Sequence, residues 1–204
     1  MSFSQFLFLC ADKVNSFFYK LFCRNRAQKN FQKNKALQFP AEKVLSDGFI
    51  TRQASLSDFR FGIKNLSYGG CGVIAIYNIL RSLKKEKGLC ELICELEKNA
   101  LVSGVFGLSP HAVGEYFERY GHKVQRIGGR KKVRRANVCG KHIIHLYFNR
   151  NLSAHYVAGI PQSDGKFRFC NADVGGGREM TFSQYHETLE KERKIMYSFL
   201  FVIG

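Results

Sequence analysis

The feature that most constrains this 204-residue chain is an apolar segment that follows two glycines and one cysteine. Residues 65–80 read NLSYGGCGVIAIYNIL, and the apolar stretch contains no helix breaker. A helix that is apolar nearly all round has to be buried on most sides. We therefore expect residues 71–84 to form a central, buried helix with Cys71 at its N-terminus.

The rest of the main domain reads as helices followed by strands. Residues 89–101 predict a second helix, and a third begins at Pro110 after the capping residue Ser109 and ends at Gly121. Strand composition follows in five segments, with a short helix over 182–192 before the last of them: 123–127, 142–148, 155–160, 166–171 and 195–203. This order predicts an α+β fold in which a helical N-terminal half packs on a C-terminal antiparallel sheet.

The N-terminal segment has a different character. Residues 3–22 predict an amphipathic helix, and residues 24–36 are polar and basic enough to form a linker, so we divide the chain into an appendage (1–36) and a main domain (37–204). The apolar seam of the predicted helix consists of Phe3, Leu7, Cys10, Val14, Phe17 and Leu21. This seam could face the domain, a partner chain or an anionic membrane surface, and the sequence leaves these three open.

The chain carries a formal net charge of +16, which attracts polyanions. The charge is concentrated in residues 1–44 and in the segment KVQRIGGRKKVRR at residues 123–135, which includes a predicted basic loop at 130–135. No recognition-helix, RNP-type or zinc-finger pattern accompanies it, which argues against a nucleic-acid-binding protein.

The seven cysteines are scattered and form no CxxC pair. This pattern favours free thiols in a reducing compartment over a disulfide framework. Cys90 and Cys94 share one helix face, but two thiols without a histidine at ligand spacing cannot complete a zinc site. We expect no metal and no cofactor.

Because no apolar run is long enough to span a membrane and no secretion signal is recognisable, we expect a cytoplasmic protein, with membrane association left open through the N-terminal helix.

Cys71 is the candidate nucleophile. A thiol attacks as its thiolate, and both a helix N-terminus and an adjacent imidazolium lower the pKa of a thiol. His155 is the best candidate for the imidazole, because it opens a strand directly after a polar loop. A third group has to fix the ring, and Asn171 and Asp173 both lie at the end of the neighbouring hairpin strand. Asn171 suits the strand-end spacing better, and turn chemistry is the alternative for both residues.

Several residues near Cys71 are candidates for contact with a substrate. Gly69 and Gly70 leave the backbone uncluttered, so a peptide could approach the sulfur closely, and Tyr68 could line the same cleft. The other histidines do not fit a catalytic role: we expect His142 and His145 to be structural, and a second group to be exposed on helices or turns, namely His111, His122 and His186.

These segments, in this order, resemble the papain-like cysteine peptidases, and most closely the branch of the double-glycine leader peptidases of bacteriocin exporters. That branch has Gln-x4-Asp-Cys-Gly-x-x-Ala before a helix, then a Gly-x-x-Pro helix, then His followed by apolar residues, and Asp or Asn about sixteen residues later. Here residues 70–75 read GCGVIA, residues 107–110 read GLSP, and His155 precedes Asn171 by sixteen positions. The resemblance spans residues 60–175.

The resemblance implies a papain-like fold, Cys71 as nucleophile, His155 as base and Asn171 as orienting residue. Asn65 stands where the family has an oxyanion-hole Gln, and Gly70 replaces the family Asp. Asn65 has the same amide donor on a shorter side chain, and the alternative is that it caps the turn. Loss of an oxyanion donor costs roughly 10²–10³ in rate, so these departures bear on activity more than on fold.

The function implied is that of a cysteine peptidase that cleaves a peptide or protein substrate through a thioester acyl-enzyme, with a preference for Gly-Gly implied by the resemblance alone. Two alternatives remain open at this stage. The same site could perform acyl transfer or deamidation on a protein, or the chain could be a non-catalytic module that binds a membrane or polyanion through its basic regions.

Overall fold

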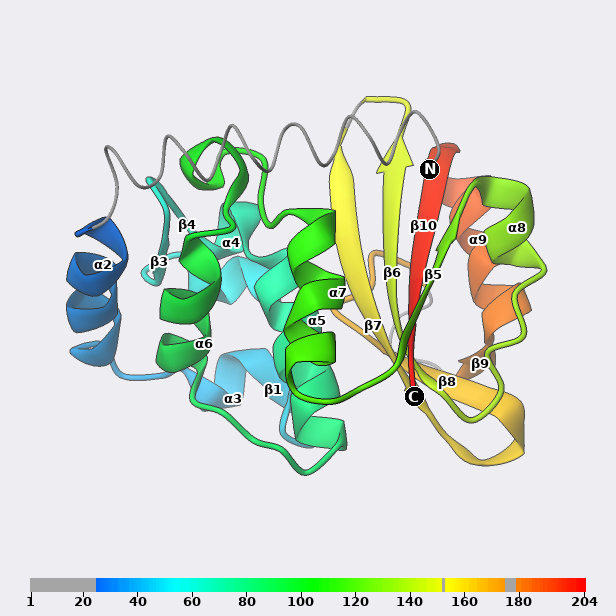
Figure 1. The fold of residues 1–204 in the computed structure, drawn as a ribbon, viewed down its shortest axis with the longest axis horizontal. Coiled ribbons are helices and arrows are strands. Elements are labelled where there is room, and N and C mark those ends of the chain that lie inside the picture. Colours follow the sequence, from blue (N-terminus) through cyan, green and yellow to red (C-terminus); the bar gives the residue numbers. More distant parts are fainter. Residues whose placement is uncertain (1–24, 152, 175–178) are drawn as a thin grey trace.

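The computed structural model describes residues 25–151, 153–174 and 179–204, so the helix predicted over residues 3–22 lies outside the described part. Within it, helices and short hairpins precede a six-stranded antiparallel sheet (Figure 1). The α+β fold predicted from the sequence, with a helical N-terminal half and a C-terminal antiparallel sheet, is confirmed.

The helical half covers residues 26–119. Its elements are α2 (Arg26–Lys35), α3 (Ala41–Val44), β1 (Leu45–Ser46), β2 (Phe49–Ile50), the 3-10 turn η1 (Gln53–Leu56), β3 (Arg60–Phe61), β4 (Lys64–Asn65), α4 (Leu66–Gly69), α5 (Cys71–Ser82), α6 (Leu89–Glu97), η2 (Leu101–Gly104) and α7 (Pro110–Arg119). The predicted start of α7 is confirmed, because Ser109 Oγ accepts the N–H of His111 and Pro110 is the first helical residue.

The sheet half covers residues 124–203. Its elements are β5 (Val124–Gly128), α8 (Arg130–Arg134), β6 (His142–Asn149), β7 (Ala154–Pro161), η3 (Ser163–Gly165), β8 (Lys166–Cys170), β9 (Met180–Thr181), α9 (Phe182–Arg193) and β10 (Ile195–Ile203). The strand order is β5-β10-β6-β7-β8-β9, and every neighbouring pair is antiparallel.

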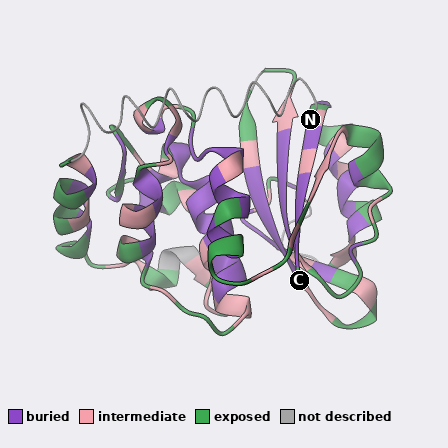
Figure 2. Cartoon of the chain, in the orientation of Figure 1, coloured by how far each residue is buried: buried purple, intermediate pink, exposed green. Residues whose placement is uncertain are grey.

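The sheet is buried on both faces because its strands are apolar at successive positions. In β6, Ile144 and Leu146 belong to the core shared with the helical half, whereas Ile143 and Tyr147 belong to a second core under α8 and α9. Successive side chains of a strand point to opposite faces, so a continuous apolar strand suits a sheet covered on both sides. Figures 1 and 2 show the helical half on one side of the sheet and α8 and α9 on the other.

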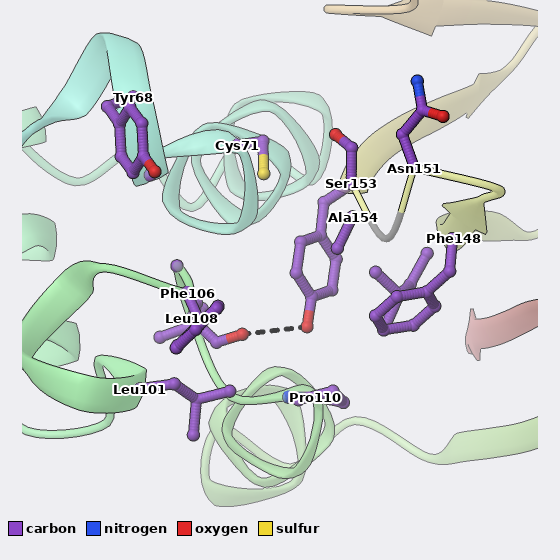
Figure 3. Close-up of a pocket in the computed structure, with 14 residues that line it drawn as sticks. Tyr68, Cys71, Leu101, Phe106, Leu108, Pro110, Phe148, Asn151, Ser153 and Ala154 are labelled. Atoms are coloured by element: carbon purple, nitrogen blue, oxygen red, sulfur yellow. Dashed lines mark hydrogen bonds between the residues drawn. The ribbon is translucent and has the colours of Figure 1, made fainter.

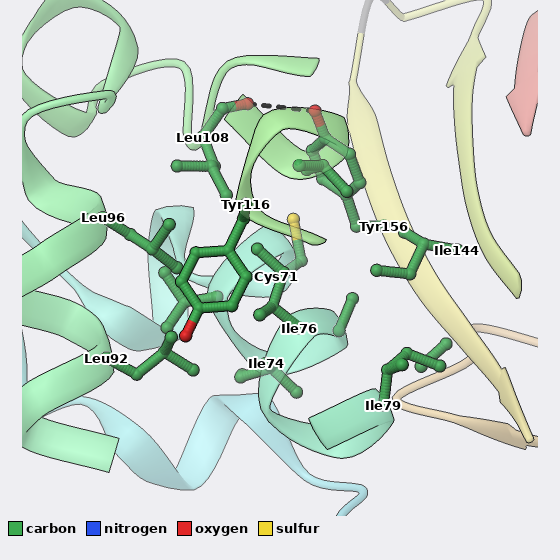
Figure 4. Packing of buried hydrophobic residues seen from close by; sticks show 14 of the residues in the cluster. Cys71, Ile74, Ile76, Ile79, Leu92, Leu96, Leu108, Tyr116, Ile144 and Tyr156 are labelled. Atoms are coloured by element: carbon green, nitrogen blue, oxygen red, sulfur yellow. Dashed lines mark hydrogen bonds between the residues drawn. The ribbon is translucent and has the colours of Figure 1, made fainter. Parts of the chain in front are cut away.

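Helix α5 is the centre of the first core, as its sequence predicts. Nine of its twelve residues are buried, and its main strand contact is β7. Figure 4 shows Ile74, Ile76 and Ile79 of this helix among side chains from α6, α7 and the sheet. Burial of each such side chain stabilises the fold by roughly 1.5–3 kcal/mol. The first residue of α5 is therefore held in place by a large core.

Residues 26–35 form helix α2 and not the linker expected there. Polar residues anchor this helix: the Asn30 side-chain amide donates to Gly62 O at 2.9 Å and to the Glu97 carboxylate, and Arg26 Nε lies 3.1 Å from Glu97 Oε1. Composition alone suggested a solvated segment, because buried polar residues with distant partners look like linker residues in a sequence.

The basic loop expected after β5 is also partly helical. Residues 130–134 form the short helix α8, which Val133 anchors by packing into the second core. In the described part, no helix has the length and apolar character needed to span a membrane.

Candidate active site

Three elements from distant parts of the sequence meet around Cys71. The cysteine is the first residue of α5, His155 lies near the start of β7, and Asn171 directly follows β8. Helix α5 packs on β7, and β7 pairs with β8, so the sheet brings the two residues to the end of the helix. The structure therefore brings together three of the residues selected from the sequence.

Cys71 is almost completely buried, with 7% of its surface exposed, and it lies in the wall of a pocket of about 390 Å³. Burial disfavours a thiolate, yet hydrogen bonding and charge from His155 outweigh it, and the pKa of Cys71 is lowered. The backbone N–H groups of Tyr156 and Gly72 also donate to the sulfur and lower the pKa further. Its position at the positive end of the helix dipole favours the same anionic state.

His155 is the partner of this sulfur. Burial opposes its protonation, but the hydrogen bond and charge of Cys71 dominate and raise the pKa of His155 to about 9. The pKa of the thiol is lowered and the pKa of the imidazole is raised, which are the directions expected where a thiolate and an imidazolium stabilise each other.

The orientation of the His155 ring is fixed from the end of β8. His155 Nε2 lies 2.7 Å from the backbone carbonyl oxygen of Asn171. Because a carbonyl only accepts, Nε2 carries a hydrogen, which leaves Nδ1 as the nitrogen that faces Cys71. Asn171 thus contacts the imidazole as predicted, but through its main chain.

The Asn171 side chain points elsewhere. Asn171 adopts a left-handed conformation (φ 57°), and its side-chain amide donates to Gln53 Oε1 at 2.8 Å. Gln53 in turn donates through Nε2 to the carbonyl oxygens of Leu66 and Ser67 in α4. Gln53 therefore ties the residue that orients the imidazole to the segment just before the nucleophile.

Asp173, the alternative third residue, also lies near the imidazole. Its Oδ1 is 3.9 Å from His155 Nε2, which is too long for a hydrogen bond but contributes to the raised pKa of His155. The Tyr147 hydroxyl donates to Asp173 Oδ2 at 2.6 Å, and Arg193 donates to the Asp173 backbone carbonyl. Asn171 and Asp173 therefore act on His155 in different ways, one by a hydrogen bond and one by charge.

Asn65 occupies the capping position that was its alternative role. Its Oδ1 accepts from the Tyr68 N–H at 3.0 Å and from Ser67 Oγ at 2.8 Å, at the start of α4. Asn65 is not among the residues that line the pocket, and its role as oxyanion donor stays a prediction. The donor that the geometry does offer is the N–H of Cys71, since the first N–H groups of a helix have no acceptor inside it.

Of the three residues predicted to contact a substrate, two line the pocket and one does not. Tyr68 and Gly69 line the pocket beside Cys71, together with Leu101, Phe106 and Leu108 (Figure 3), whereas Gly70 is buried outside it. A Cβ on Gly69 would lie 2.7 Å from Gly104 O, and one on Gly70 would lie 2.4 Å from Leu66 O. Close packing of the backbone therefore requires both glycines, which is a reason that the sequence analysis did not give.

Two residues of the site were missed in the sequence. Gln53 lies in a short turn 118 positions from Asn171, and no local pattern connects them. Tyr147 lies directly opposite His155 in the β6–β7 pairing, so a correct strand register would have placed it near the site.

The remaining histidines are structural or exposed. His145, which was expected to be structural, is buried with Nε2 2.6 Å from Ser198 Oγ, and His111 is half-exposed near Glu115. The expectation that His186 is exposed is wrong: it is completely buried beside Ser198, because α9 turns this face toward the sheet.

Among the described residues, no group of three or more His, Cys, Asp or Glu side chains could hold a metal ion.

Comparison with known proteins gives structural matches only. No protein-family model matches the sequence, and no curated protein sequence is significantly similar to it. The peptidase domain of Streptococcus ComA, a bifunctional ABC transporter involved in quorum sensing, matches with 12% identity and a TM-score of 0.42, over 65% of this chain and 89% of that one.

A double-glycine-motif protease from an AMS/PCAT transporter, solved in complex with the leader peptide, matches with 15% identity and a TM-score of 0.41, over 66% of this chain and 84% of that one. The resemblance to double-glycine peptidase domains seen in the motifs is thus also a structural similarity, at low sequence identity. Because both TM-scores are below 0.5, we base the function on the geometry of the site.

Proposed function

We propose that this chain is a cysteine peptidase in which Cys71 is the nucleophile and His155 is the general acid and base. The observation that carries this proposal is the hydrogen-bonded Cys71–His155 pair at the N-terminus of a buried helix, with a lowered pKa for the thiol and a raised pKa for the imidazole. The pair lies beside an apolar pocket that could hold part of a peptide.

The reaction follows from the positions of these groups. The Cys71 thiolate attacks the carbonyl carbon of the scissile peptide bond, and a C–S bond forms as the carbonyl oxygen becomes an oxyanion. The Cys71 N–H and the dipole of α5 stabilise that oxyanion. When the C–N bond breaks, the His155 Nδ1–H protonates the leaving amine, and a thioester remains on Cys71.

Water then completes the cycle. Neutral His155 removes a proton from the attacking water, the C–S bond breaks, and the acid product leaves with the Cys71–His155 pair restored. Throughout, the Asn171 carbonyl keeps the ring oriented by accepting the Nε2–H. Asp173 favours the protonated state of the ring by its charge.

The direct test is site-resolved alkylation with iodoacetamide at pH 6, read by mass spectrometry. Cys139 serves as an internal control because it is an exposed free thiol of the same chain. We expect Cys71 to react at least about tenfold faster than Cys139 despite its burial, because the thiolate is the reactive species. If Cys71 reacts no faster than Cys139, the activated nucleophile is refuted.

The reaction type needs a separate measurement with a matched pair of variants. We expect the wild-type chain to cut members of a peptide library, and His155→Gln to lose about 10²–10⁴ in rate while His111→Gln stays near wild type. A mass change without chain scission would instead indicate acyl transfer or deamidation.

A further inference from the structure

Gln53 connects the residue that orients His155 with the segment that precedes Cys71. It lies in the turn η1, and its side-chain amide contacts Asn171 on one side and helix α4 on the other. The turn is well anchored, because Leu56, three residues further along, is completely buried in the first core. Gln53 therefore has a fixed support from which it can position other groups.

Two hydrogen bonds join Gln53 to Asn171. The Asn171 side-chain amide donates to Gln53 Oε1 at 2.8 Å, and the backbone N–H of Gln53 donates to Asn171 Oδ1 at 3.3 Å. Both polar atoms of the Asn171 side chain are thus bound to Gln53. The side chain is therefore held away from the imidazole, and the backbone carbonyl is the group that Asn171 presents to His155 Nε2.

The other end of the Gln53 amide is bound to helix α4. Gln53 Nε2 donates to Leu66 O at 3.1 Å and to Ser67 O at 3.0 Å, so both amide hydrogens have an acceptor. Leu66 O also accepts the N–H of Gly70 at 2.9 Å, and Gly70 directly precedes Cys71. The same side chain thus contacts the orienting residue and the backbone that leads into the nucleophile.

These three contacts require a carboxamide of this length. Asn171 Nδ2 needs an acceptor, whereas Leu66 O and Ser67 O need donors, and an amide supplies one acceptor and two donor hydrogens. An ionised glutamate would place an oxygen against two carbonyl oxygens. A methionine of similar size would make none of the three bonds. The chemistry of the site therefore selects glutamine at position 53.

Asn171 depends on this support because its backbone is left-handed, with a φ of 57°. That conformation is costly for residues other than glycine, although asparagine tolerates it better than most, and it persists where the surroundings impose it. The backbone conformation decides where the carbonyl points, and the carbonyl lies 2.7 Å from His155 Nε2. The bond from the Asn171 side chain to Gln53 thus bears directly on the orientation of the ring.

We infer that Gln53 is a positioning residue of the active site, which holds the Asn171 carbonyl on His155 and fixes both relative to the start of α5. Its hold on the ring is a property of the folded chain and is independent of the reaction. Its effect on catalysis rests on the proposed peptidase function.

The test compares Gln53→Met with Gln162→Met. Gln162 is a matched control, because it is also half-buried, its amide also donates to two backbone carbonyl oxygens, and it follows β7 at the end opposite to His155. Asn171→Gly removes the same contact from the other side, and glycine adopts a positive φ without strain. This variant keeps the test decisive if Gln53→Met fails to fold. Exchange of the β6 amides reports that each variant is folded.

The first measurement is the exchange of the His155 Nε2–H with water, followed by NMR of the imidazole. We expect a protected hydrogen in the wild type and in Gln162→Met, and at least about tenfold faster exchange in Gln53→Met and Asn171→Gly, because the carbonyl no longer retains it. An unprotected hydrogen in the wild type, or an unchanged rate in either site variant, overturns the proposal.

The second measurement is the iodoacetamide alkylation of Cys71 as a function of pH. At pH 6 the rate should fall at least about fivefold in Gln53→Met and stay unchanged in Gln162→Met, and the rise of the rate should move to the higher pH of an ordinary thiol. A loss of unfolding free energy with an unchanged pH profile would show a purely structural role and overturn the proposal.

A double variant tests whether Gln53 acts through Asn171. Gln53→Met combined with Asn171→Gly should react no more slowly than the slower single variant, because both changes break the same contact. Effects that multiply would show that Gln53 acts by another route, against the proposal. If wild-type Cys71 reacts no faster than Cys139, the proposed peptidase function fails, and the exchange of the His155 Nε2–H still decides whether Gln53 positions the ring.

Discussion

At the scale of single residues, the site depends on which atom of each residue faces the imidazole. The position of Asn171 at the end of the strand paired with the His155 strand selected it correctly as a neighbour, yet its carbonyl makes the contact and its side chain bonds Gln53. The left-handed backbone of Asn171 decides this, and only three-dimensional geometry fixes that conformation. Asp173 was a second candidate in the sequence, and in the structure it acts at 3.9 Å through charge.

The raised pKa of His155 predicts a pH profile. Cleavage needs the thiolate and the imidazolium together, so kcat/KM should be bell-shaped: it rises as pH passes the lowered pKa of Cys71 and falls near pH 9, where His155 loses its proton. Peptide-cleavage rates measured across about pH 4–10 give the acid and alkaline limbs of this kcat/KM profile. An alkaline limb near pH 6.5 would show an unperturbed histidine and contradict the pairing.

Asp173→Asn should move the alkaline limb to lower pH, because it removes a negative charge that favours the imidazolium. The loss of kcat/KM at pH 7 should stay below about tenfold, since the Asn171 carbonyl still orients the ring. Asp164→Asn in the β7–β8 turn is the matched control, because Asn tolerates its left-handed conformation (φ 60°). An unchanged limb in Asp173→Asn would exclude an electrostatic role for Asp173.

At the scale of elements, the start of α5 is fixed by close backbone packing. Three glycines surround Cys71, and a Cβ on any of them would lie between 2.4 and 2.8 Å from a neighbouring atom. The sequence analysis interpreted Gly69 and Gly70 as room for a substrate. In the structure, other protein atoms fill the space beside these glycines, because α4 and the turn 101–107 pack against the backbone there.

Gly69→Ala should therefore destabilise the fold by about 1–3 kcal/mol and displace the turn 101–107, because the clash at 2.7 Å is with the backbone carbonyl of Gly104. Urea unfolding measures the change. Gly204→Ala is the control: no atom lies within 4 Å of its added Cβ, and the change should stay within about 0.5 kcal/mol. Equal free energies of unfolding for the two variants would mean that the turn 101–107 moves to accept the added Cβ without destabilising the fold.

At the scale of the whole molecule, the sheet is covered on both faces, and the second core encloses two histidines. His145 and His186 lie with ring centroids 5.5 Å apart, and Ser198 Oγ lies between them, 2.6 Å from His145 Nε2. Burial lowers the pKa of both, most strongly that of His145, although the charge of Glu190 partly opposes the shift at His186. At neutral pH both rings are therefore neutral in the folded protein.

This burial makes stability dependent on pH. Below the ordinary histidine pKa of 6.5, the unfolded chain binds protons that the folded chain does not, so the free energy of unfolding falls as pH falls below 6.5. Urea unfolding midpoints should be lower at pH 5.5 than at pH 7.5. This pH-dependent difference should be smaller in His145→Leu, whereas the half-exposed His111→Gln should leave the difference unchanged. A pH response that His145→Leu does not alter would place its origin in other groups.

The sequence by itself determined the α+β order, the central helix that begins at Cys71 and the neighbourhood of His155 and Asn171, because these depend on hydrophobic periodicity, capping and turn residues that act over short distances. Only the tertiary structure decided that residues 26–35 are a packed helix, that Gln53 bonds Asn171, and that Tyr147 and His186 are buried. Those outcomes depend on hydrogen bonds and burial between segments distant in sequence, which no local pattern encodes.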